Sequence, residues 1–267
     1  MSLNLHRGHG RGNPIADAAR WIAQARKTVV LTGAGVSTES GIPDFRSATG
    51  LWARYDPQEY ATLSAFLREP AKVWTMLAEL EELLEARPNA GHAALARLEA
   101  GGGTAGIVTQ NVDGLHQAAG SRTVVEFHGH NRTFTCLGCR RKFPRAAVRA
   151  MPAVPGTRMP RPEPCPAGAP GRCLLKPDVV FFDEQIPPEA LLGSEALLGG
   201  ADLVLVVGTS CEVYPAADLP RQVRQQGGRI VEINLEPAAG LAPDLLLQGR
   251  FGEVMPAVVD AWERMRA

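Results

Sequence analysis

Three short apolar runs of the chain each end in residues that could hold a ligand or transfer a proton. Short β-branched runs of this kind are typical of buried parallel strands. In open α/β sheets, ligands bind beyond the carboxyl ends of the strands, so we expect the residues after each run to lie at one edge. The runs and the residues that follow them are 28–32 with Gly33, Ala34 and Gly35, 104–109 with Gln110, Asn111 and Asp113, and 123–127 with His128.

The glycine turn after the first run has the composition of a phosphate-binding loop. Gly33 and Gly35 let the backbone turn tightly and let a phosphate approach the amides without interference from a Cβ atom. A helix that begins near Thr38 would add free N–H groups suited to a pyrophosphate. The full dinucleotide fingerprint has a third glycine where this chain has Thr38, so an ordinary strand-to-helix turn is the alternative.

A carboxylate, an aromatic ring and a guanidinium follow the glycine turn side by side. Pro43 fixes its own φ and disfavours helix at Ile42, so this segment does not continue a helix. Asp44 could bond to sugar hydroxyls, Phe45 could cover a ring, and Arg46 could pair with a phosphate. The alternative is a solvated loop with a local Asp–Arg pair.

The second and third runs deliver polar side chains. Gln110, Asn111 and Asp113 carry amide and carboxylate groups that suit ribose hydroxyls and a carboxamide, although Asn111 or Asp113 could instead cap a helix. His128 ends the third run, and Gly129 after it permits a sharp exit of the chain. A histidine in that place is suited to general base catalysis, and a structural histidine is the alternative. We interpret His92 and His116 as structural.

Two further strands and a C-terminal segment add candidate ligands. Residues 201–207 form a buried run that ends in Gly208, Thr209 and Ser210, whose hydroxyls and N–H groups can hold a phosphate or a ribose. Residues 228–233 deliver Asn234, Leu235 and Glu236, which we place at an adenosine ribose. We expect Phe251, near the last strand, to contact adenine.

Four of the five cysteines lie within residues 136–173. In a chain without a recognisable export signal, this clustering favours reduced thiols and a metal over disulfides. Two CxxC pairs would indicate a tetrahedral zinc site, but here the second pair is separated by seven residues. We predict a structural zinc site with the ligands Cys136, Cys139, Cys165 and Cys173.

Composition limits the classes of partner. The 267 residues are 45% hydrophobic, and the 28 basic residues balance the 28 acidic ones, so net charge predicts no polyanion partner. No run approaches the ~18 apolar residues of a membrane span. Residues 1–13 are polar and lack the apolar core of a secretory signal, so we expect a disordered tail and a cytoplasmic location.

The stretches GAGVSTESGIPDFRS (residues 33–47), TQNVDGLHQAAGS (109–121) and VVEFHGH (124–130) closely resemble signature blocks of the sirtuins, the NAD-dependent protein-lysine deacylases. The resemblance runs from about residue 14 to the C-terminus, with the blocks in the correct order. It implies a Rossmann-like parallel sheet with an inserted small zinc-binding module, and the alternation of strands and helices agrees. The implied boundaries are 14–130 and 174–267 for the NAD-binding domain and 131–173 for the module.

The resemblance also implies a reaction and its residues. NAD, water and an Nε-acyl-lysine of a protein or peptide give lysine, nicotinamide and O-acyl-ADP-ribose. His128 aligns with the family's catalytic base. Asn111 and Asp113 align with residues that hold the nicotinamide end of NAD, and Phe45 aligns with the residue that shields the reactive ribose. The implied contacts with the rest of NAD come from Gly33, Ala34, Gly35, Arg46, Ser210 and Asn234, and the implied peptide cleft is lined by Val180, Phe182, Asp183, Glu184 and Val213.

Two departures and two rival functions bear on this prediction. Asp183 stands where the family commonly has glycine, which affects substrate geometry. Desuccinylating sirtuins have Tyr and Arg where Leu77 and Leu80 align, so we expect acetyl or apolar acyl groups over succinyl. The rivals are a sirtuin-like mono-ADP-ribosyltransferase or NAD hydrolase, and a basic zinc ribbon that binds nucleic acid. Phe134 and Phe143 are too few for a base-stacking platform, so the sequence argues against nucleic acid as a partner.

Overall fold

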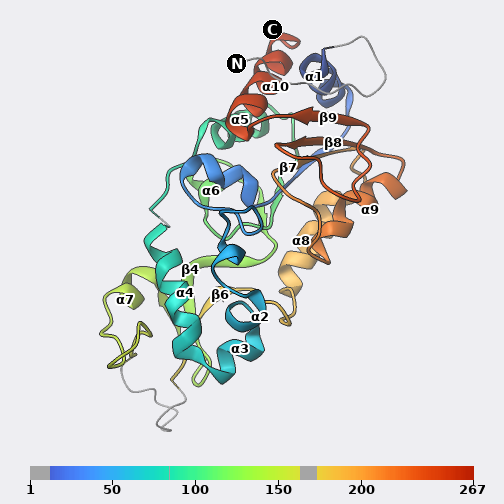
Figure 1. Ribbon diagram of the computed structural model, residues 1–267. Helices are drawn as coiled ribbons and strands as arrows, with labels where there is room; N and C mark the ends of the chain where they lie inside the picture. The colour runs from blue at the N-terminus through green and yellow to red at the C-terminus, as the bar shows by residue number, and fades with distance from the viewer. Residues whose placement is uncertain (1–12, 84, 163–172) are drawn as a thin grey trace.

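A parallel sheet of six strands forms the body of the protein (Figure 1). The computed structural model describes residues 13–83, 85–162 and 173–267. The strand order is β3-β2-β1-β7-β8-β9, which is the 3-2-1-4-5-6 order of dinucleotide-binding folds when the strands of this sheet are counted along the chain. The predicted Rossmann-like sheet is thereby confirmed. The strands are β1 (Thr28–Thr32), β2 (Ile107–Thr109), β3 (Val124–Glu126), β7 (Leu203–Val207), β8 (Arg229–Asn234) and β9 (Leu245–Gln248).

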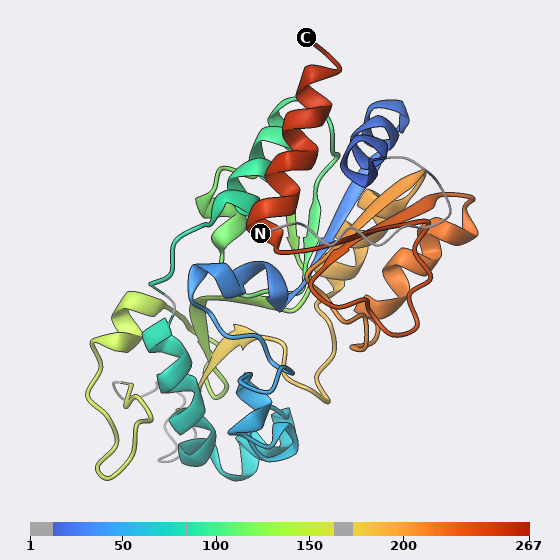
Figure 2. The ribbon, with the colours of Figure 1, turned by 45° about the horizontal axis from the view of Figure 1, so that its top comes forward.

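Helices cover both faces of this sheet, which is why its central strands are buried along their whole length. Every residue of β1 and β7 is buried, and the two strands pair in register from Thr28 with Leu203 to Thr32 with Val207. Figure 2 shows α5 and α10 side by side on one face. One face packs against α1 (Pro14–Gln24), α5 (Ala90–Ala100) and α10 (Phe251–Arg264), and the other against α8 (Pro188–Leu198) and α9 (Leu219–Gln225).

A second, smaller lobe has its own apolar core. Trp74 stacks on Phe134 with ring centroids 5.7 Å apart, and its Nε1 donates to the Leu175 carbonyl at 3.2 Å. The segment 131–173 therefore shares its core with the helices before it in the chain. The lobe consists of α2 (Pro57–Tyr60), α3 (Leu63–Arg68), α4 (Pro70–Leu83), the antiparallel strands β4 (Gly129–Cys136), β5 (Lys142–Pro144) and β6 (Leu175–Val179), and α7 (Arg145–Arg149).

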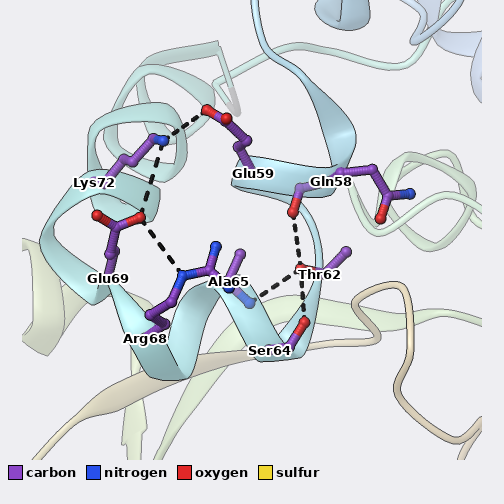
Figure 3. Close-up of polar contacts among 8 residues, drawn as sticks. All are labelled: Gln58, Glu59, Thr62, Ser64, Ala65, Arg68, Glu69 and Lys72. Atoms are coloured by element: carbon purple, nitrogen blue, oxygen red, sulfur yellow. Dashed lines mark hydrogen bonds and ion pairs between the residues drawn. The ribbon is translucent and has the colours of Figure 1, made fainter.

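The short helices of this lobe are fixed by local polar contacts (Figure 3). Thr62 caps α3, because its hydroxyl accepts from the Ala65 N–H at 3.0 Å and donates to the Gln58 carbonyl at 3.2 Å. Lys72 of α4 reaches Glu59 of α2 at 2.7 Å. An exposed pair of this kind contributes about 0–1 kcal/mol, so burial of Phe66 and Trp74 dominates the stability of the lobe.

The segment after the glycine turn differs from the prediction. A 3₁₀ helix, η1 (Ala34–Ser40), begins inside the turn, whereas the sequence predicts a helix start near Thr38. Gly41 ends η1 with a φ of 90°, a conformation that favours glycine. The remaining short helices are η2 (Leu51–Ala53), α6 (Leu115–Ala118) and η3 (Ala216–Asp218).

Replacement of Gly35 tests the packing of the glycine turn. A Cβ atom there would lie 2.9 Å from the backbone of Gly208, closer than real Cβ contacts allow. We expect Gly35→Ala to lower the free energy of unfolding by about 1–3 kcal/mol, because the two backbones must separate. Urea denaturation of the variant and the wild type measures this difference, and equal midpoints with equal slopes would contradict it.

Candidate functional site

The glycine turn after β1 and the turn after β7 meet where the strand order of the sheet reverses. The Gly35 N–H donates to the Gly208 carbonyl at 2.9 Å, and a Cβ atom on Gly33 would lie 2.6 Å from the Cβ atom of Thr209. Both glycines are therefore required by the contact between the turns, which the sequence did not indicate. In doubly wound folds this reversal point is where ligands bind. The turns place Ala34 and Ser210 at the same edge.

A buried hydrogen-bond network joins the residues after β2 to this edge. Asn111 donates through Nδ2 to the Gly33 carbonyl at 3.0 Å and to the Ser37 hydroxyl at 3.1 Å. Ser37 in turn donates to Asp113 at 2.7 Å. The predicted pair of Asn111 and Asp113 is thus brought together through Ser37, a residue that sequence reasoning missed. Only its place within the 33–47 signature could have indicated it.

Asp113 has two functions in this network. One carboxylate oxygen accepts from the N–H of Leu115, the first residue of α6, at 2.9 Å, although the N-cap residue of this helix is Gly114 and not Asp113. The other accepts from Ser37. Burial raises the pKa of the Asp113 carboxyl above its ordinary value, although the hydrogen bonds from Leu115 and Ser37 oppose that shift. A half-buried carboxylate fixed in this way is suited to a sugar hydroxyl or an amide.

The far side of the edge is organised around Thr209. Gln110 donates through Nε2 to the Thr209 hydroxyl at 2.9 Å, and Asn234 donates to the Thr209 carbonyl at 3.1 Å. Asn234 also donates at 2.7 Å to Glu232, whose carboxylate is fully buried and accepts from the Ala238 N–H as well. Three separate strand ends, after β2, β7 and β8, therefore converge on one residue.

His128 lies at the end of β3, half-buried beside these groups. Its Nδ1 is 3.1 Å from the Gln110 carbonyl oxygen. A carbonyl only accepts, so Nδ1 carries the proton and Nε2 is the basic nitrogen. Burial lowers the pKa of His128 below its ordinary value, so the ring is neutral at pH 7. Gly129 has a φ of 74° and directs the chain into β4, as the sequence predicts.

The segment with Asp44, Phe45 and Arg46 is a closed loop. Leu51 N–H donates to the Asp44 carbonyl and Trp52 N–H to the Phe45 carbonyl, each at 2.9 Å. The Asp44 carboxylate accepts from the N–H groups of Arg46 and Ser47, at 3.1 and 2.8 Å. The local Asp–Arg side-chain pair is not formed. Arg46 instead lies 3.1 Å from Glu212, far along the chain.

Aromatic contacts connect this loop to the predicted peptide segment. The rings of Phe45 and Trp52 have centroids 5.2 Å apart, and those of Trp52 and Phe182 are 6.3 Å apart. Phe45 and Phe182 are each 37% exposed, so both present ring surface to a ligand. Trp52 was not among the predicted site residues.

The predicted peptide segment is anchored on both sides. Val180 N–H donates to the His128 carbonyl at 2.8 Å, and Phe182 N–H to the Ala61 carbonyl at 2.9 Å. Asp183 has a φ of 59°, the left-handed conformation that favours glycine, which explains why glycine suits this position. Its carboxylate accepts from the Leu63 N–H at 2.7 Å and so anchors the start of α3.

Glu184 has a structural partner. Its carboxylate lies 2.9 Å from Nζ of the buried Lys176 and accepts from the Phe181 N–H at 3.0 Å. Lys176 also donates to the Val179 carbonyl at 2.7 Å and lies over the Phe181 ring. The structure therefore places Glu184 in the support of the peptide segment, with its charge already paired.

Three of the predicted contacts of the adenosine end differ in their surroundings. Leu235 is 56% exposed and Glu236 is also exposed, so both are open to a ligand. Phe251 is not brought to the site. Its ring is buried in the core at the start of α10, edge-on to His92 at 5.3 Å, because the apolar face of the helix begins there.

Comparison with known proteins identifies the family. Residues 33–215 match the model of the Sir2 family. The chain belongs to the Sir2 family. It is 46% identical over 251 residues to the NAD-dependent protein deacylase 2 of Pyrobaculum aerophilum, a match that covers 93% of this chain and 96% of the relative.

Solved structures of the Sir2 family agree with the fold. A Sir2 homologue in complex with NAD is 39% identical, with a TM-score of 0.84 and coverage of 98% of both chains. A Sir2 protein with a deacetylated p53 peptide and 3′-O-acetyl ADP-ribose is 33% identical, with a TM-score of 0.85 and coverage of 92% of this chain and 97% of that one.

Three of the four predicted metal ligands of this Sir2-family chain are among the described residues. Cys136, Cys139 and Cys173 belong to one core cluster of the small lobe, whereas Cys165 lies outside the described residues. Residues 1–12 of the predicted tail, which was residues 1–13, also lie outside them. Within residues 13–83, 85–162 and 173–267, no group of three or more metal-ligating side chains is assembled. No helix in the same part of the chain is long and apolar enough to cross a membrane.

The two histidines interpreted as structural are buried behind the site. His92 completes a capping box with Asn89, and His116 bonds to the Thr32 hydroxyl at 2.9 Å. Their ring centroids are 5.0 Å apart. Burial lowers the pKa of His92 to about 4, and burial with the neighbouring His92 lowers the pKa of His116 to about 3.

This histidine pair makes the stability of the protein decrease in acid. Each pKa lies below the ordinary 6.5, so the unfolded chain binds more protons as pH falls through that window. Between pH 6.5 and about pH 4 we expect each histidine to lower the free energy of unfolding by on the order of 3 kcal/mol. Urea denaturation across this range measures the loss, and we expect the free energy of unfolding of His116→Gln to depend less steeply on pH. An equal dependence of this free energy on pH in the variant and the wild type would contradict the assignment.

Proposed function

We propose that the chain is an NAD-dependent protein-lysine deacylase that gives lysine, nicotinamide and O-acyl-ADP-ribose. One observation carries the proposal: at the reversal point of the sheet, a buried amide–carboxylate network lies beside a neutral histidine whose Nδ1 is tied to the Gln110 carbonyl. The network supplies a fixed site for a dinucleotide. The histidine supplies a base.

The donor set fits NAD. Asn111 uses its Nδ2 for Gly33 and Ser37, which leaves its amide oxygen for the carboxamide of nicotinamide. Arg46 offers a guanidinium for the pyrophosphate, and Asn234 lies where β8 ends, for the adenosine ribose. NAD supplies the ribose carbon at which nicotinamide is exchanged for the acyl oxygen. We propose that the same site includes the other predicted contacts with NAD. These are Gly33, Ala34, Gly35, Asp44, Phe45, Gln110, Asp113, Gly208, Thr209, Ser210, Leu235 and Glu236.

The residues around the reacting atoms have separable roles. His128 accepts a proton from a ribose hydroxyl at Nε2, while the bond from Nδ1 to the Gln110 carbonyl steadies the resulting cation. Phe45 covers the ribose and excludes water. Asn111, held at three points by Gly33, Ser37 and Thr109, orients the nicotinamide end.

The pH dependence of the reaction tests the base. Because burial holds the pKa of His128 below 6.5, the ring stays basic through neutral pH and activity is lost only as pH falls below that value. We expect a plateau of kcat/KM for NAD above pH 6.5. An acid limb centred above pH 7 would contradict the assignment.

Deacetylation itself tests the proposed function. A synthetic acetyl-lysine peptide is incubated with and without NAD, and loss of the acetyl group is followed by mass spectrometry. We expect loss only with NAD, and a decrease of about 10²–10⁴-fold in His128→Ala, the usual range for removal of a general base. His130→Ala is the matched control, because the proposal gives that residue no function. Deacetylation that survives in His128→Ala would contradict the mechanism.

The acyl pocket favours uncharged acyl groups. Leu77 and Leu80 pack with Trp52 and Tyr55 in an apolar cluster next to Phe182. A succinyl carboxylate would be buried against these leucines, and the guanidinium over the Tyr55 ring, that of Arg54, is already paired with Glu79, so we expect its burial to cost several kcal/mol. We expect kcat/KM for succinyl-lysine to be below that for acetyl-lysine, and Leu80→Arg to raise the ratio. A succinyl to acetyl ratio above one in the wild type would contradict this.

We also propose that the small lobe holds a structural zinc ion on Cys136, Cys139, Cys165 and Cys173. The backbone supports this, because Arg140 N–H donates to the Cys136 carbonyl at 2.8 Å in a tight turn. Leu137 N–H donates to the Leu174 carbonyl at 2.9 Å, which brings Cys173 next to that turn. Reduced thiols of this kind fit the proposed cytoplasmic location.

Metal analysis tests the zinc proposal. We expect one zinc per chain, and Cys139→Ser to lose the metal and lower the melting temperature, because structural zinc contributes folding free energy. Cys211→Ser, outside the cluster, serves as the control. Metal-free protein with unchanged stability would contradict the proposal.

A further inference from the structure

An ion pair connects the segment proposed for NAD to the segment proposed for the peptide. Arg46 Nε lies 3.1 Å from Glu212 Oε2. The two side chains are 41% and 50% exposed, so both remain accessible to solvent and ligands. Arg46 directly follows Phe45, and Glu212 directly precedes Val213. The pair therefore lies where both ligands would approach.

Two carboxylates, Asp44 and Glu212, are candidate partners of the Arg46 guanidinium, and the structure pairs it with Glu212. The loop that carries Arg46 is closed by backbone bonds from Leu51 and Trp52, and a Cβ atom on Gly50 would lie 2.7 Å from an oxygen of Asp44. The loop backbone is thus closely packed around Asp44, whereas the Arg46 side chain is 41% exposed. Asp44 is committed to backbone N–H groups, so Glu212 is the carboxylate that pairs with Arg46 in the described structure.

The other carboxylates of the peptide segment are engaged. Asp183 accepts from the N–H groups at the start of α3, and Glu184 is paired with Lys176. After Val213 in the chain, Arg221 is paired with Asp218 and bonded to Tyr214. Glu212 differs from these carboxylates, because its exposed partner, Arg46, is also the residue proposed to bind the NAD pyrophosphate. An exposed pair of this type changes an equilibrium constant by only about two- to fivefold, so it exchanges readily.

We propose that Glu212 is a specificity-determining residue, which binds a lysine or arginine side chain of the acyl-peptide once the NAD pyrophosphate has drawn Arg46 away. This inference rests on the proposed function. Before NAD binds, Arg46 neutralises Glu212; afterwards the carboxylate is left at the cleft without that cation. NAD and a basic peptide then each favour binding of the other, because the coupling between two ligands is reciprocal.

Peptide charge gives the first test. Three acetyl-lysine peptides are compared that differ only in a flanking Lys, Gln or Glu, with wild type, Glu212→Gln and the control Glu195→Gln, an exposed carboxylate on α8. We expect wild type to prefer the Lys over the Glu peptide by about fivefold in kcat/KM, less at ~0.5 M salt. Glu212→Gln should lose the preference and Glu195→Gln should keep it. No preference in wild type, or the same preference in Glu212→Gln, would overturn the proposal.

Calorimetry of NAD binding without peptide gives a second test that needs no turnover. Glu212→Gln frees Arg46, so NAD should bind about two- to fivefold more tightly than to wild type. Unchanged or weaker binding would overturn the coupling. Absence of deacetylation of all three peptides by wild type would instead count against the proposed function, and the calorimetry still decides the inference about Glu212.

Discussion

The contact between the turns after β1 and β7 is the constraint on which the site depends. Gly33 and Gly35 allow the two backbones to touch Gly208 and Thr209, since no side chain fits between them. The backbone and side-chain groups of these turns then orient the polar side chains that follow the neighbouring strands. The Gly33 carbonyl fixes Asn111, and Thr209 fixes Gln110 and Asn234. A ligand at this edge meets donors and acceptors already oriented by the sheet, which lowers the entropy cost of binding.

The small lobe is coupled to that edge through a few named contacts. Phe182 contacts Trp52, whose ring also contacts Phe45, Val180 is bonded to His128, and Asp183 anchors α3. Each contact links a residue proposed for the peptide to one proposed for NAD or to the lobe core. The chemistry therefore takes place between two bodies whose relative position is set by ring packing and backbone bonds more than by exposed ion pairs.

Sequence patterns predicted what depends on burial and local geometry. β1 was predicted at its observed bounds, because every residue is apolar or β-branched and buried on both faces. Contacts between residues far apart in the chain were not predictable: Ser37 with Asn111, Gln110 with Thr209, and Arg46 with Glu212. Phe251 was misplaced because a ring at the start of an amphipathic helix has the same local pattern whether it faces a ligand or the core.

The central claim is that cleavage of NAD is committed to an acyl-lysine acceptor, and the stoichiometry of the reaction tests it most directly. Nicotinamide release and peptide deacetylation are measured in one reaction, with the acetyl-lysine peptide present and absent. The account predicts one nicotinamide for each lysine deacetylated and almost none without peptide. Rapid release without peptide would contradict it and indicate an NAD hydrolase or an ADP-ribosyltransferase on the same fold.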